Sequence, residues 1–383
     1  MKAKVGKYLL VLATLGFIAG GLYYLNLSNR HKAIVKTTLL HKLGLVDNQW
    51  HVSYTDSSTI FVTPTMVIDN IYKSMEGPKV MRAFQLNPNK SELLWLNSFK
   101  TTAISTNEND ILSNDYICHS NVDYYDGEHF GKWQLPDRIG QQYPRLTSMS
   151  NGIESYSFPK GFGFPVFSDE YLFLSSQILN HNIKSRAFSV KHKLELGYAH
   201  NNDSIKPLMS KTLFVALPVI NNNSAVDYNT LNQNTNSCLP VDIKNHMYLN
   251  EKGEQVSGHW FISPGKSTYK SEVTKQLGLK EPTSLHFIAV HLHPFAESLT
   301  FRDKTTDSII FISHAENYKD KIGLKKATAF SNKEGIMIYP DHMYELEVEI
   351  NNTTNTVQDM MASMFIFLYD KEMYEKTKNY KGL

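Results

Sequence analysis

The body of this 383-residue chain is a succession of short apolar runs separated by turn-forming clusters. The runs are rich in β-branched and aromatic residues, and asparagine-rich punctuation such as NPNKS (87–91) and INNTTNT (350–356) follows them. Outside 269–279, no long stretch of the body keeps an apolar period of 3.6 residues. Short strands bounded by turns are typical of antiparallel β-sandwiches, so we predict an all-β protein. The predicted strands lie within residues 58–68, 171–180, 211–220, 285–293, 308–315, 343–350 and 363–370.

A polar break at residues 201–207 divides the body into two parts, each long enough for one sandwich. We therefore predict a first β-sandwich domain at 31–205 and a second at 206–383, after an N-terminal segment at 1–30.

That N-terminal segment has the charge and hydropathy pattern of a membrane anchor. Three lysines, Lys2, Lys4 and Lys7, precede a mostly apolar run over 8–27 that is long enough to span a bilayer. Basic residues before a span keep that end in the cytoplasm, so the body is expected on the extracytoplasmic side, periplasmic, lumenal or extracellular. A cleaved signal peptide is the alternative, although no convincing cleavage site follows the run.

Charge and cysteine content exclude some classes of protein. The 39 Lys+Arg and 37 Asp+Glu residues nearly balance, which leaves no electrostatic footprint for nucleic acid. Two cysteines, Cys118 and Cys238, are too few for a disulfide scaffold; they could pair or remain free thiols.

Two histidines, His291 and His293, are separated by one leucine inside a strand-like run. Side chains alternate faces along a strand, so both imidazoles project the same way and could bind one metal ion. A core position would more readily hold Val or Leu, because a buried imidazole needs hydrogen-bond partners. The alternative is that both are ordinary histidines on a half-exposed strand.

Three methionines, Met360, Met361 and Met364, lie close together near the C-terminus. Most methionines are pliable core fillers. One thioether could instead complete a His-His-Met site, a donor set suited to copper because soft sulfur favours Cu(I) and imidazole tolerates both oxidation states.

Taken together, four stretches resemble the copper type II, ascorbate-dependent monooxygenases, the family of the peptidylglycine α-hydroxylating and dopamine β-monooxygenases. They occur in the family's order, and they are NDYICHSNVDYY (114–125), FPKGFGFPVFSDEYLFL (158–174), VHLH (290–293) and QDMMASMFIFLY (358–369). Aligning Asp359 with the family's aspartate makes Met361 the ligand methionine.

The resemblance implies two jelly-roll-like sandwiches, each with one copper. The second-domain copper, on His291, His293 and Met361, would activate dioxygen and abstract hydrogen from a substrate carbon. The first-domain copper would store and relay an electron from ascorbate or another reductant. The expected activity is C–H hydroxylation by a membrane-tethered copper monooxygenase.

The first-domain site departs from the family. Cys118-His119 stands where the family has two histidines, and Gln177 stands where a third histidine is expected. A Cys118, His119 and Gln177 set could hold Cu(I), or this site could be lost. Leu179 and His181 lie near Gln177 in the sequence, and His129 is a further candidate in a turn-like stretch.

Substrate contacts depart as well. Ala289, Ser363 and Phe365 replace the polar groups with which the family holds a carboxylate-terminated peptide. The substrate, a small molecule or a peptide, is therefore unassigned. The alternative function is a non-catalytic copper-binding protein for capture, sensing or partner binding. Four other histidines are expected at the surface, in turns or at edges, and they are His192, His200, His314 and His342.

Overall fold

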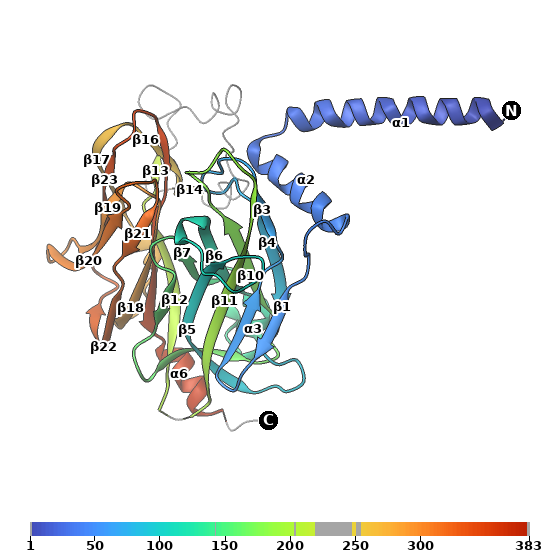
Figure 1. Cartoon of the computed structure of the whole chain (residues 1–383). Helices are drawn as coiled ribbons and strands as arrows, with labels where there is room; N and C mark the ends of the chain where they lie inside the picture. Colours follow the sequence, from blue (N-terminus) through green and yellow to red (C-terminus); the bar gives the residue numbers. More distant parts are fainter. Residues whose placement is uncertain (1, 142, 203, 219–246, 250–253, 381–383) are drawn as a thin grey trace.

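The computed structural model describes residues 2–141, 143–202, 204–218, 247–249 and 254–380. Over these residues the chain is mostly β and forms several sheets (Figure 1), which confirms the predicted fold class at that level.

The largest sheet has 11 strands and passes through both halves of the chain. Its order is β1 (His51–Tyr54), β2 (Ser58–Val62), β11 (Phe188–His200), β5 (Leu93–Ile104), β9 (Phe162–Phe167), β12 (Lys206–Phe214), β25 (Ala362–Tyr369), β18 (Thr283–Leu292) and β22 (Phe330–Ile338), while β3 (Met66–Ile68) pairs with β11 and β8 (Ser155–Ser157) pairs with β5. The parallel pair β9–β12 joins the two halves, and the predicted boundary at 205 lies just before β12.

Smaller sheets complete the body. The four-stranded sheet has the order β4 (Lys79–Phe84), β10 (Leu172–Ile178), β6 (Ile117–Tyr124) and β7 (Arg145–Ser150). The five-stranded sheet has the order β17 (Gly265–Glu272), β23 (Tyr344–Asn352), β19 (Ala296–Asp303), β20 (Ser308–Asn317) and β21 (Leu324–Ala327). The last two sheets are β13 (Leu217–Pro218), β15 (Gln255–Ser257) and β14 (Met247–Leu249), and the pair β16 (Trp260–Ile262) with β24 (Gln358–Met360).

Helices are few in the described chain. The α-helices are α1 (Lys2–Leu25), α2 (Asn29–Lys42), α3 (Asp126–Lys132), α5 (Thr274–Leu277) and α6 (Lys371–Lys378), and the 3-10 turns are η1 (Asn114–Tyr116) and η2 (Pro136–Arg138). The stretch 269–279 is thus the end of β17 followed by the short α5, not one amphipathic helix.

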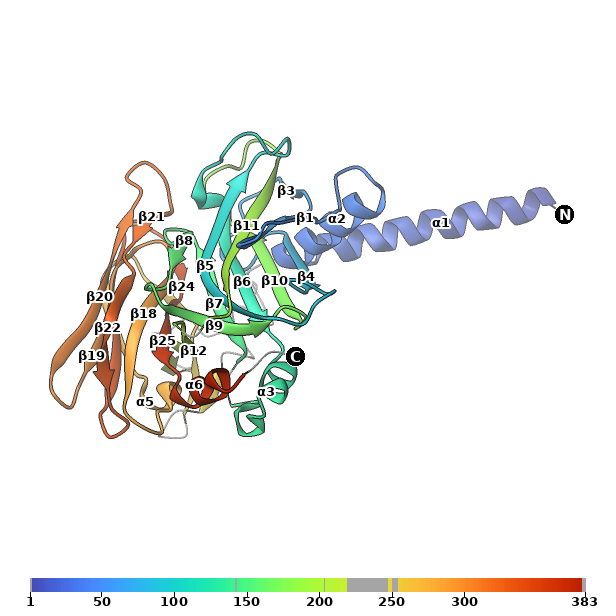
Figure 2. The ribbon, with the colours of Figure 1, turned by 90° about the horizontal axis from the view of Figure 1, so that it is seen from below.

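The N-terminal helix α1 projects away from the body in both views (Figures 1 and 2). No helix in the described part of the chain has both the length and the apolar character needed to cross a bilayer. The prediction of a transmembrane helix over 8–27 is therefore not supported.

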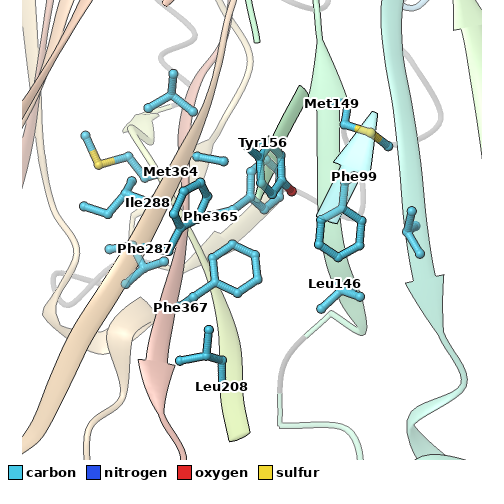
Figure 3. Packing of buried hydrophobic residues seen from close by; sticks show 14 of the residues in the cluster. Phe99, Leu146, Met149, Tyr156, Leu208, Phe287, Ile288, Met364, Phe365 and Phe367 are labelled. Atoms are coloured by element: carbon cyan, nitrogen blue, oxygen red, sulfur yellow. The ribbon is translucent and has the colours of Figure 1, made fainter. Parts of the chain in front are cut away.

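The two halves share one hydrophobic core (Figure 3). Phe158 comes from the first half, and its ring centroid lies 5.6 Å from that of Phe287 and 4.6 Å from that of Phe367, both from the second half. Tyr156 stacks on Phe287 with ring centroids 5.0 Å apart. This packing joins β8 of the first half to β18 and β25 of the second half, and β18 carries one of the histidines described next.

Candidate metal centre

The pairing of β18 with β25 decides which methionine accompanies the two histidines. His291 lies opposite Ser363, and the backbone N–H of His293 donates to the carbonyl of Met361 over 3.2 Å. Residues directly opposite each other in a sheet share a face, so Met361 lies on the face of His291 and His293. The neighbouring methionines, Met360 and Met364, are fully buried in the core instead.

His291 and Met361 line one cavity of about 180 Å³ between the two halves. Two further histidines line it, His119 from β6 and His259, which precedes β16. Trp260 on β16 pairs with Met360 on β24, and the two strands are antiparallel. His259, one residue before Trp260, is therefore next to Met361, one residue after Met360. The sequence prediction missed His259, because a lone histidine with no repeating partner carries no spacing signal.

The imidazole rings lie close together. The ring centroids of His291 and His293 are 5.4 Å apart, those of His119 and His291 are 6.2 Å apart, and those of His259 and His293 are 6.1 Å apart. All four side chains are buried. Strands from both halves of the chain therefore bring four histidines to one place, which no single sequence motif indicates.

Both ring nitrogens of His293 lie close to polar groups of other residues. Its Nε2 lies 3.0 Å from the Ser74 hydroxyl, and its Nδ1 lies 3.1 Å from Oδ2 of Asp359. Burial raises the pKa of Asp359, but the hydrogen bond and charge of His293, with smaller contributions from His181 and His259, outweigh it and bring the pKa to about 2. An ionised Asp359 beside Nδ1 favours a proton on that nitrogen, and Nε2 faces Ser74 instead of the carboxylate.

Burial keeps two of the nearby imidazoles neutral. It lowers the pKa of His119 well below its usual value, and the charge of Lys79 adds to this effect. It lowers the pKa of His181 to about 4 despite the opposing charge of Asp359. A neutral imidazole has a lone pair available for a metal ion, so burial favours ligation over protonation here.

The three residues predicted for the first-domain copper site, Cys118, His119 and Gln177, have different surroundings. Gln177 lies opposite His119 in the sheet, but its amide donates to the carbonyl of Gly77 over 3.0 Å. Burial raises the pKa of the Cys118 thiol to about 11, and its Sγ lies 3.7 Å from the Ser74 hydroxyl. Of these three residues, His119 alone lines the cavity. The suggested partner of Cys118, Cys238, lies outside the described residues.

Within the described chain, no three side chains among His, Cys, Asp and Glu converge closely enough to hold a metal ion. A site with three ligands therefore needs either the thioether of Met361 or a change in the side-chain rotamer of one of the histidines.

Other histidines have structural roles. His129 lies on α3, not in a turn, where its Nδ1 is 2.8 Å from Glu170, and it is not at the metal centre. The prediction that His192 lies at the surface is wrong, because His192 is fully buried on β11 and bonds Ser176. His200 is exposed as predicted, and His342 contacts Asp303 over 2.6 Å.

Comparisons with known proteins assign no family. No family model and no curated protein matches the chain. Among solved structures, the STIV MCP gives a TM-score of 0.29 at 8% identity, covering 83% of this chain and 99% of its own. The cowpea mosaic virus top component, a naturally occurring empty particle, gives a TM-score of 0.31 at 11% identity, covering 76% and 88%. These scores are too low to support any argument, so function must be argued from the site.

Proposed function

We propose that this protein binds one copper ion through His291, His293 and Met361. The observation that carries the proposal is the strand register, which gives two imidazoles and one thioether a common face. Two imidazoles bound to one tetrahedral ion at ~2 Å have ring centroids roughly 5 Å apart. The 5.4 Å between the rings of His291 and His293 fits that arrangement.

The surroundings of His293 also suit a metal ligand. Metal-binding histidines usually donate the other ring N–H to a carboxylate, which fixes the tautomer and makes the ligating nitrogen more basic. The carboxylate of Asp359 lies 3.1 Å from Nδ1 of His293, near enough to take this role. The Ser74 hydroxyl now lies at Nε2, so copper would exchange places with a neutral hydroxyl, whose hydrogen bond is weak enough to give up.

Capture of one copper ion is the function that this site supports best. Gln177 donates to the carbonyl of Gly77, and the thiol of Cys118 contacts the same Ser74 hydroxyl as His293. The described residues therefore offer no second, independent set of three ligands of the kind that the family resemblance implies. His119 faces the same cavity as His291 and would belong to the same centre.

A copper monooxygenase is the second candidate. The cavity of about 180 Å³ beside His291 and Met361 has room for a small molecule, and Phe365 and Thr212 contribute to its wall. Bound copper would supply the reduction of dioxygen, and ascorbate or another reductant would have to supply the electrons. Copper-dependent oxygen uptake with ascorbate, absent in His291→Ala, would support this activity; no uptake with any reductant would leave capture alone.

The register of β18 and β25 predicts that Met361 contributes to Cu(I) binding and that Met364 does not. In Met361→Leu, the Cu(I) affinity should fall at least about tenfold, because a soft ligand is lost from the site. In Met364→Leu, a volume-conserving change in the core, the Cu(I) affinity should stay as in the wild type. Competition with a colourimetric Cu(I) chelator measures both. Equal affinities of Met361→Leu and wild type would remove the thioether from the site.

A further inference from the structure

A second cavity, of about 310 Å³, lies at the other end of β18. Thr283, the first residue of β18, lines it, whereas His291 lines the cavity of the metal centre. Eight residues of strand separate the two positions, which is ~26 Å at 3.3 Å per residue. Cavities of this size are typical of sites for small organic molecules.

Apolar side chains form much of the wall of this second cavity. They come from elements distant in sequence, and they are Phe130 on α3, Phe164 on β9, Leu208 on β12 and Tyr369 on β25. Such a wall favours a ligand with an apolar body, because burial of apolar surface is worth about 25 cal/mol per Å².

One half-buried cation in this wall has no ion-pair partner among the described residues. Lys211 lines the cavity and is half-buried, and its ammonium makes no hydrogen bond or ion pair with any residue that the structure describes. Burial lowers the pKa of Lys211 and the positive charge of Arg138 lowers it further, whereas the negative charge of Asp370 acts in the opposite direction. The ammonium is thus held where its charged form is destabilised, a cost that an anionic ligand would offset.

Two neighbouring cations, Arg138 and Lys371, are already paired with carboxylates. Arg138 forms a bidentate pair with Asp370 over 2.6 and 2.8 Å and also contacts Glu372 over 2.7 Å. Lys371 pairs with Glu281 over 3.3 Å. The acidic partners Asp370 and Glu372 line the same cavity, so a ligand with two negative charges would be repelled more than a ligand with one.

We propose that this cavity binds an amphipathic monocarboxylate, with its apolar chain against the aromatic wall and its carboxylate on the ammonium of Lys211. The site is independent of copper binding, because it shares no residue with the metal centre.

Calorimetric titration of the full chain with octanoate, and with octanol as the uncharged analogue of equal length, tests the proposal. The wild type should bind octanoate at least about tenfold more tightly than octanol, since a hydrogen bond to a charged group is worth roughly 1.5–3 kcal/mol. Lys211→Met keeps the apolar stem and should lose this preference. Lys371→Met removes a lysine from the same cavity wall, but one that already has a partner, and should keep it.

The stability of the variant separates loss of binding from loss of folding. Without ligand, Lys211→Met should be at least as stable as the wild type in thermal unfolding, because an unpaired, partly desolvated charge has been removed. Four results would overturn the proposal. The wild type could bind octanoate and octanol equally, or bind neither. The octanoate affinity could be unchanged in Lys211→Met, or it could fall equally in Lys211→Met and Lys371→Met, which would make the effect one of net charge.

Discussion

In His291→Ala, the copper-to-protein ratio after Cu(I) loading should fall from near one to near zero. His291 is the imidazole that both lines the cavity and lies on the face of Met361. Its loss leaves two ligands, and the remaining imidazole, His293, is already bonded to Ser74. A two-ligand remnant cannot compete with a chelator, since each ligand of a structural or catalytic site contributes several kcal/mol. Metal analysis of the desalted protein measures the ratio.

An exposed histidine supplies the matched control. His200 ends β11, far along the chain from the centre, and its side chain is 60% exposed. His200→Ala should retain a ratio near one, and thermal unfolding of both variants should show that neither is unfolded. A ratio that stays near one in His291→Ala would contradict the assignment.

The variants His119→Ala and His293→Ala then test which set of ligands holds the ion. The proposal requires loss of binding in His293→Ala and a smaller effect in His119→Ala, because His119 lies 6.2 Å from His291, whereas His293 lies 5.4 Å from it, measured between ring centroids. The reverse result would show that the ion lies between the two halves, on His119, and not on the face of β18.

The parts of this site that the sequence predicts are those with a local signal. Strand alternation places His291 and His293 on one face without knowledge of any neighbour. The choice of Met361 among three methionines came from a motif resemblance, and the register of β18 and β25 gives it a physical reason. His259 carries no such signal, since its place beside His293 depends on the pairing of β16 with β24, about one hundred residues apart in sequence.

The surroundings of the predicted first-domain residues also depend on contacts that the sequence does not show. Gln177 pairs opposite His119, but its amide donates to the carbonyl of Gly77, about one hundred residues away in sequence. His192 was expected at the surface because polar residues surround it, yet β11 is an inner strand of the 11-stranded sheet. Whether a strand lies inside a sheet or at its edge depends on the tertiary fold, so the local sequence does not predict the burial of His192.

In the fold as in the site, local features can be predicted from the sequence and long-range contacts cannot. Short strands and turns predict an all-β chain, and the structure agrees. The pairing of β9 with β12 and the contacts of Phe158 with Phe287 and Phe367 join segments that no local pattern connects. Continuity of the sheet and of the core across the predicted domain boundary is therefore visible only in three dimensions.

Replacement of Glu170 by alanine should destabilise the fold by about 2–5 kcal/mol, because it removes the acceptor of two buried donors and each unsatisfied buried group costs roughly 1–3 kcal/mol. Glu170 and His129 are 2% and 1% exposed, and the carboxylate contacts Nδ1 of His129 over 2.8 Å. The other carboxylate oxygen accepts the backbone N–H of Phe167 over 3.0 Å. Alanine would leave both donors without a partner in a site that excludes water, since the ring of His129 stacks on Phe164 with centroids 5.1 Å apart.

Glu170→Gln separates the charge of this carboxylate from its hydrogen bonds. Glutamine keeps an oxygen for the N–H of Phe167, and its amide can donate to Nδ1 if His129 adopts the other neutral tautomer, so the loss should be only about 1–3 kcal/mol. Glu281→Ala, which removes the exposed partner of Lys371, should cost less than about 1 kcal/mol. Urea unfolding of the three variants gives the order directly. Glu170→Ala and Glu281→Ala could instead unfold at the same urea concentration. That result would mean that water reaches His129 and Glu170, and that α3 packs less tightly against the end of β9 than the structure shows.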